Sequence, residues 1–123
     1  MALIFAYLKI LVVFLTALIK LLGFGAETVE IELYADPSSG YYWEHSYDKD
    51  GILLLSGTHY VPDTSAIFSG GGGKQKYTFR EIGSGTVNIT FEYVKIGSDE
   101  VASKYVYTYN VADDGTITLI NVT

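Results

Sequence analysis

The stretch TVNITFEY, residues Thr86 to Tyr93, alternates polar and apolar side chains without interruption. Because successive side chains of a β-strand point to opposite faces, this period of two predicts a half-buried strand. Its apolar members are β-branched or aromatic, the types that strands favour. They are Val87, Ile89, Phe91 and Tyr93. This is the clearest strand signal in the chain.

Alternation on both sides of this stretch predicts further strands, separated by turn residues. They cover residues 27–33, 41–47, 52–56, 105–111 and 117–122, and one more begins at Tyr77. The strands at 105–111 and 117–122 are joined by a hairpin turn at Asp113-Asp114-Gly115. About seven short strands without a helix among them predict an all-β fold, an immunoglobulin-like β-sandwich.

The composition is typical of one small β-rich domain. The chain has 123 residues, of which 49% are hydrophobic, so it is long enough for a single core and too short for two. It contains no cysteine, which excludes disulfides, thiolate metal sites and cysteine nucleophiles. Residues 26–123 carry six basic and fourteen acidic side chains, a net charge of −8. Such an excess repels phosphate backbones, so we expect no nucleic-acid partner.

The first 25 residues differ from the rest of the chain. Residues 2–22 are almost wholly apolar, interrupted by Lys9, Thr16 and Lys20. They predict an apolar helix that is either a signal peptide or a membrane anchor, since about 20 apolar residues span a bilayer. A helix lying on a membrane surface or against a partner is a third interpretation. Under the first two, residues 26–123 form an exported domain that is secreted, periplasmic or held at the outer face of a membrane.

Residues 57–76 show no periodicity and include four consecutive glycines, Gly70 to Gly73. They predict a long, flexible loop that crosses between the sheets. The segment does not match a phosphate-binding loop, because Phe68 stands where the first glycine is required and Gln75 where Ser or Thr is required. Four glycines in a row are costly in conformational entropy, and a backbone that lies close against another surface would explain them.

Residues 36–43 read Asp-Pro-Ser-Ser-Gly-Tyr-Tyr-Trp, a sequence typical of a turn that is followed at once by the only tryptophan of the chain. Proline presets φ, the Asp and Ser side chains can bond their own backbone, and Gly40 permits φ > 0. These features predict a tight, exposed loop. Trp43 is too large to leave in water, and we expect it to anchor the base of the loop to the core.

No arrangement of residues indicates catalysis or metal binding. His45 and His59 have no motif around them, and we interpret each as a surface or core filler. Asp48 and Asp50 have the first spacing of a calcium loop, but the later ligands are missing and a turn is the better interpretation. We therefore expect a protein that is not an enzyme and that uses no cofactor or metal.

Two of these segments resemble the chagasin family of cysteine protease inhibitors. The family's first loop reads Asn-Pro-Thr-Thr-Gly-Tyr-x-Trp, and residues 36–43 stand in its place with conservative changes. Its second loop is glycine-rich and precedes an aromatic strand, as the glycine run precedes Tyr77 and Phe79 here. The resemblance covers about residues 27–122. It implies an immunoglobulin-like sandwich that inhibits papain-like cysteine proteases reversibly and without a covalent bond.

The resemblance also implies a wedge of three loops, with the Ser38-Ser39 turn entering the protease cleft beside the catalytic Cys and His of the protease. The third loop departs from the family pattern, because Lys95-Ile96-Gly97 stands in place of Arg-Pro-Trp. Loss of an interface tryptophan commonly costs about 2 kcal/mol or more, which predicts altered potency or target range. The implied protease contacts are Asp36, Pro37, Ser38, Ser39, Gly40, Tyr41, Gly70, Gly71, Gly72, Gly73, Lys95 and Ile96.

Two other functions stay open on the sequence alone. A surface adhesion or assembly module would keep the sandwich without inhibitory activity, and this interpretation gains if residues 2–22 are retained and pack into a membrane or filament. A sugar-binding module using exposed tyrosines is the third, although no motif supports it.

Overall fold

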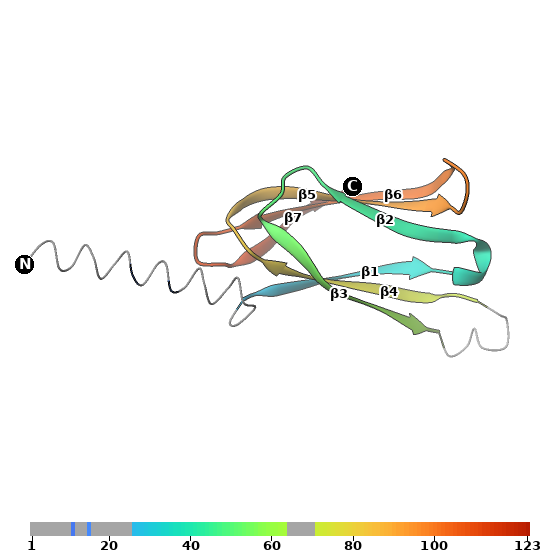
Figure 1. Ribbon diagram of the computed structural model, residues 1–123, viewed down its shortest axis with the longest axis horizontal. Helices are drawn as coiled ribbons and strands as arrows, with labels where there is room; N and C mark the ends of the chain where they lie inside the picture. The colour runs from blue at the N-terminus through green and yellow to red at the C-terminus, as the bar shows by residue number, and fades with distance from the viewer. Residues whose placement is uncertain (1–10, 12–14, 16–25, 64–70) are drawn as a thin grey trace, which may run out of the picture.

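The computed structural model describes residues 26–63 and 71–123, together with the single positions 11 and 15. Two antiparallel sheets, one of three strands in the order β1-β4-β3 and one of four in the order β2-β5-β6-β7, face each other as a sandwich (Figure 1). The strands are β1 (Thr28–Ala35), β2 (Tyr41–Tyr47), β3 (Leu53–Pro62), β4 (Gly73–Glu81), β5 (Gly85–Lys95), β6 (Val101–Val111) and β7 (Ile117–Val122). The prediction of an all-β fold with seven strands is confirmed.

Within residues 26–63 and 71–123, the helical structure is limited to one 3₁₀ turn, η1 (Pro37–Ser39). The predicted signal peptide or anchor helix falls on residues 1–25 and lies outside the described residues, apart from the single positions 11 and 15. Among the residues that the structure describes, no helix has the length and apolar character needed to cross a bilayer.

Strand β5 lies inside the four-stranded sheet, between β2 and β6. Val87, Ile89 and Phe91 on its inner face are fully buried, while Asn88 and Thr90 between them are only partly buried. The period of two in the sequence therefore appears as a period of two in burial, as predicted. Each fully buried side chain of this size contributes about 1.5–3 kcal/mol, so this face is a main source of the stability of the sandwich.

Aromatic rings join the two sheets. The ring of Phe91 meets that of Phe79 from β4 edge to face, with centroids 6.2 Å apart, and both side chains are completely buried. His45 from β2 packs beside them, with its ring centroid 6.0 Å from that of each phenylalanine. Burial lowers the pKa of the partly buried His45 imidazole. The interpretation of His45 as a filler of the core is therefore confirmed.

The prediction of a long loop over residues 57–76 is wrong at both of its ends. Strand β3 continues to Pro62, β4 begins at Gly73, and the two strands pair with each other up to these residues. The connection between them joins neighbours in one sheet and does not cross between the sheets. A β-bulge shifts the register between Leu55 and Gly57, so the alternation along β3 is interrupted there and gives no continuous period in the sequence.

Acidification should destabilise the fold through His45. Because its pKa in the folded chain lies below the ordinary value of 6.5, the unfolded chain binds the proton more readily. The free energy of unfolding should therefore fall as the pH drops below about 6.5. Replacing His45 with Phe should remove this part of the pH dependence, measured by urea denaturation between about pH 7.5 and 5.5.

The matched control for this experiment is His59→Gln, because His59 is exposed on β3. This variant should keep the slope of the parent. Equal slopes for the parent and His45→Phe over the same pH range would contradict the assignment.

Candidate functional site

Three connections between strands lie together at one end of the sandwich (Figure 1). They are the turn from β1 to β2, the connection from β3 to β4 and the turn from β5 to β6. We call their described residues 36–40, 71–73 and 95–100 the loop edge. The segments are far apart in the sequence, and they meet because β1, β3 and β5 all run toward this end.

The first segment of the loop edge is the single turn η1, closed by its own side chains. Asp36 is the N-cap, and its Oδ1 accepts hydrogen bonds from the Ser38 backbone N–H at 3.1 Å and the Ser38 hydroxyl at 2.6 Å. The Ser39 hydroxyl donates to the Asp36 carbonyl at 2.6 Å. Gly40 follows with φ +81°, a left-handed conformation that glycine adopts without strain. The predicted tight turn, with Asp36 capping a backbone N–H group, is confirmed.

Tyr93 of β5, which is only 8% exposed, ties this turn to the core. Its hydroxyl accepts a hydrogen bond from the Asp36 backbone N–H at 2.9 Å. Its ring stacks on Tyr41 with centroids 5.4 Å apart and packs against Trp43 at 4.6 Å. The Trp43 indole N–H donates to the carbonyl of Tyr34 at 2.9 Å. Trp43 therefore anchors the base of the loop, as predicted, with Tyr93 as a second anchor.

Gly71 lies directly against the first turn. A methyl group at this position would lie 2.5 Å from Asp36 Oδ1 and 2.8 Å from Ser38 Oγ. Both distances are well inside van der Waals contact, so any larger residue here would displace the Asp36 and Ser38 side chains that close the turn. The expectation that the glycine run lies close against another surface is confirmed at this position.

The two glycines that follow are also constrained. Gly72 has φ +91°, and a methyl group there would lie 3.2 Å from the Tyr34 hydroxyl oxygen. A methyl group at Gly73 would collide with the Val61 carbonyl oxygen of the neighbouring strand β3. Gly70, the first predicted contact of this segment, lies outside the described residues.

The third segment is bonded to the first. The Ile96 backbone N–H donates to the Gly40 carbonyl at 2.8 Å, and the Tyr41 hydroxyl donates to Glu100 Oε1 at 2.9 Å. The bond to this carboxylate raises the pKa of the Tyr41 phenol. The turn itself is closed by the Lys95 N–H, which donates to the Glu100 carbonyl at 3.0 Å. The side chains of Lys95 and Ile96 are exposed.

The structure thus places every described residue of the predicted contact set on or next to the loop edge. The side chains of Pro37, Ser38 and Ser39 are exposed at its tip. Sequence reasoning did not single out Tyr93 or Glu100, which hold the edge together. The available signal for Tyr93 was its place near the end of the clearest predicted strand, next to the third loop.

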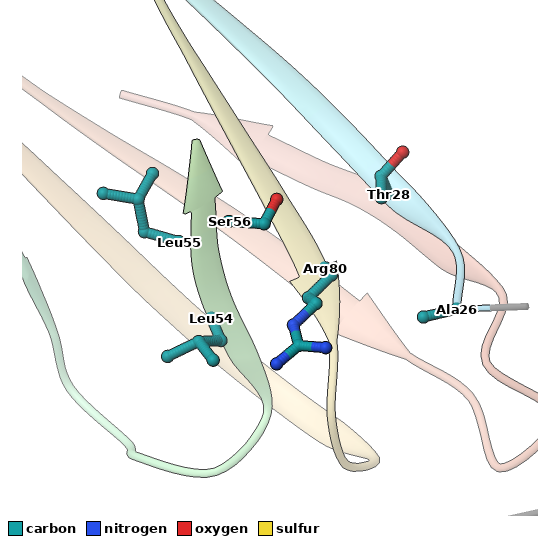
Figure 2. Close-up of a pocket in the computed structure, with 6 residues that line it drawn as sticks. All are labelled: Ala26, Thr28, Leu54, Leu55, Ser56 and Arg80. Atoms are coloured by element: carbon teal, nitrogen blue, oxygen red, sulfur yellow. The ribbon is translucent and has the colours of Figure 1, made fainter. Parts of the chain in front are cut away.

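An open pocket lies at the opposite end of the three-stranded sheet. Figure 2 shows the Arg80 guanidinium near Leu54, with the hydroxyls of Ser56 and Thr28 on the neighbouring strands. These lining side chains include no pair placed for acid–base or nucleophilic catalysis. In the part of the chain that the structure describes, no group of three potential metal ligands occurs. The loop edge is therefore the better candidate for the functional site.

Comparison with known protein families gives a match over most of the chain. The family described as chagasin family peptidase inhibitor I42 matches residues 25–111. The chain belongs to the chagasin family. This confirms the resemblance to the family and identifies the protein as an inhibitor of peptidases, not an enzyme.

Two solved structures resemble this chagasin-family chain. The crystal structure of the cysteine protease inhibitor EhICP2 from Entamoeba histolytica aligns with a TM-score of 0.54 and 24% identity, over 66% of this chain and 75% of that one. The solution structure of amebosin aligns with a TM-score of 0.49 and 27% identity, over 68% of this chain and 76% of that one. The first supports the sandwich fold. A comparison with curated proteins found no match.

Removing the Tyr93 hydroxyl should loosen the first turn of this chagasin-family protein without unfolding it. Tyr93→Phe keeps the ring and removes the acceptor of the partly buried Asp36 N–H, which should lower the free energy of unfolding by about 1 kcal/mol. Hydrogen exchange at the Asp36 amide should become faster.

Tyr42→Phe is the matched control, because the Tyr42 hydroxyl donates to Glu44 at the protein surface. Its free energy of unfolding should stay close to that of the parent. If Tyr93→Phe left the exchange rate at Asp36 unchanged, the proposed tie between core and turn would be wrong.

Proposed function

We propose that this chain is a reversible, non-covalent inhibitor of papain-like cysteine proteases and that the loop edge occupies the active-site cleft of the protease. The observation that carries the proposal is that three loops meet in one edge, joined by packing at Gly71 and by a hydrogen bond at Ile96. Pro37, Ser38 and Ser39 are exposed at its tip. Membership of the chagasin family of peptidase inhibitors supports it. Inhibition by occupation needs no reactive group on the inhibitor, because inhibitor and substrate compete for one cleft.

The tip of the loop edge is ordered before any partner binds. The Ser38 and Ser39 hydroxyls donate to the Asp36 carboxylate and carbonyl, and the Asp36 N–H is held by Tyr93. A segment that is already fixed loses little conformational entropy on docking, so more of its contact energy remains as affinity. The two serines act by their shape and their backbone, and no acylation or cleavage is part of the mechanism.

Asp36 introduces a negative charge close to the tip. Burial of an uncompensated carboxylate in a complex would be costly. Asp36 already accepts hydrogen bonds from the Ser38 N–H and hydroxyl, and these donors stay with it when water is excluded. An aspartate can therefore take the place of asparagine in this turn.

The flanking segments grip the walls of the cleft on either side of the turn. Gly71 is partly exposed and offers backbone without a side chain, which allows close approach of a protease surface. Gly72 and Gly73 are buried and support the edge from within. Lys95 and Ile96 lie on the other flank, where Ile96 is fixed to Gly40. The three segments together form a wedge that is wider than the serine turn alone.

We also propose that the sandwich is of immunoglobulin-like type and that it works outside the cytoplasm. Two antiparallel sheets of three and four strands support the first point. The apolar character of residues 2–22 supports the second, whether they act as a cleaved signal peptide or as a membrane anchor.

The mass of the exported protein distinguishes these two roles of the N-terminal segment. A cleaved signal peptide predicts a soluble product that lacks about 25 residues. An anchor predicts the complete chain in the membrane fraction. Both are measured by mass spectrometry after cell fractionation, and a complete chain in the cytosolic fraction would contradict export.

A bulky side chain at the tip should weaken inhibition strongly and leave the fold intact. The full chain, kept in solution with a mild non-ionic detergent, is titrated against papain and a cathepsin-like enzyme with a peptide substrate. The parent should inhibit at micromolar concentration or below. Ser38→Trp should raise the inhibition constant by about 100-fold, because the indole cannot enter the space that the turn fills.

The control is Ser84→Trp, which places the same bulk on an exposed residue in the turn between β4 and β5, at the opposite end of the sandwich. It should inhibit as the parent does. Failure of the parent to inhibit at micromolar concentration would refute the proposal. Equal constants for the parent and Ser38→Trp would show that the first turn is not the contact.

A further inference from the structure

Two large exposed apolar side chains, Tyr34 and Ile96, lie beside and within the loop edge. Of all the large apolar side chains that the structure describes, Ile96 and Tyr34 expose the largest fractions, 66% and 65%. A folded domain gains nothing from leaving side chains of this size in water, and a partner that covers them would gain the free energy of apolar burial. Both belong to the same end of the sandwich, as their positions in the strands show.

Their places in the fold put them on opposite flanks of the serine turn. Tyr34 is the next-to-last residue of β1, in the three-stranded sheet, and Ile96 directly follows β5, in the four-stranded sheet. The ends of both strands reach the loop edge (Figure 1). The turn η1 leaves β1 and returns as β2 in the other sheet, so it passes between these two positions.

The backbone of each residue is held. The Tyr34 carbonyl accepts the Trp43 indole N–H at 2.9 Å, and its phenol lies over Gly72, where a methyl group would be 3.2 Å from the hydroxyl oxygen. The Ile96 N–H donates to Gly40 at 2.8 Å. Exposed side chains on a backbone that is already fixed bind with less loss of backbone conformational entropy.

We propose that Tyr34 and Ile96 are the two apolar anchors of the inhibitory wedge, one on each side of the serine turn. This inference rests on the proposed function and adds to it the chemistry of the partner. The protease must offer an apolar subsite on each wall of its cleft, one for the phenol ring and one for the branched aliphatic side chain. Ile96 already belongs to the contact set predicted from the sequence motifs. Tyr34 is a new member of that set.

The inference also assigns a source of selectivity. The serine turn approaches groups that proteases of one mechanism share, whereas the walls of the cleft vary from one protease to another. Anchors on both flanks would therefore favour proteases with two apolar subsites and disfavour those with a charged residue on either wall, because a buried unpaired charge is costly.

The test compares Tyr34→Ala and Ile96→Ala in the full chain, in the papain titration described above. Each variant should raise the inhibition constant by about tenfold. The double variant should raise it by about 100-fold, because contributions from separate sites add in free energy. Tyr34→Phe keeps the ring and should inhibit within about threefold of the parent.

The matched control for Ile96→Ala is Ile120→Ala, since Ile120 is the same residue type, is 57% exposed and lies on β7, away from the loop edge. It should leave inhibition unchanged. Tyr34→Gln and Ile96→Gln form a second pair that keeps the side-chain length and removes its apolar character. The unfolding temperature of each variant is measured, and a value close to that of the parent shows that the variant is folded.

The outcomes separate this inference from the proposed function. If the parent inhibits and either alanine variant stays within about threefold of it, the two-sided anchor is wrong and the proposed function stands. If the parent does not inhibit, the proposed function fails and this inference fails with it. Losses at both positions, with Ile120→Ala unchanged, establish the two anchors.

Discussion

The hydrogen bond from the Asp36 N–H to the Tyr93 hydroxyl joins the tip of the molecule to its core. Tyr93 belongs to β5, whose inner face carries the fully buried Val87, Ile89 and Phe91. Its ring packs against Trp43 and stacks on Tyr41, and its hydroxyl reaches the first residue of the turn. The position of the exposed serines is therefore set by the packing of the sandwich, through one side chain that belongs to both.

The other two segments of the edge are built around this fixed turn. Gly71 leaves no space for a side chain beside Asp36 and Ser38, and Ile96 is bonded to Gly40 on the far side. Glycine is required at the first junction for close approach, whereas a backbone hydrogen bond makes the second. The result is a preformed edge. A protein with such an edge can inhibit an enzyme by filling its cleft, and it needs neither a pocket nor a reactive group.

The exposed apolar residues in and beside the edge are a disadvantage for the free protein. Ile96 and Tyr34 remain in water in the free protein, where they add to the risk of non-specific association. The surrounding domain carries a net charge of −8 over residues 26–123, and mutual repulsion between copies counteracts that risk. The net negative charge therefore helps to keep the domain monomeric although Ile96 and Tyr34 are exposed.

Local patterns in the sequence determined a large part of this structure. The alternation in residues 86–93 predicts β5 and its buried face, and the order Asp-Pro-Ser-Ser-Gly predicts a capped turn with a left-handed glycine, because these features depend on residues two to four positions apart. The loop motifs also identified the family. Tertiary structure alone decided the extent of β3, where a bulge after Leu55 hides the period. It also decided which residues meet at the edge. Asp36 and Tyr93 are 57 residues apart, and Gly71 and Ile96 reach the turn from two different sheets. Such contacts follow from the register and packing of whole strands, which no local pattern specifies.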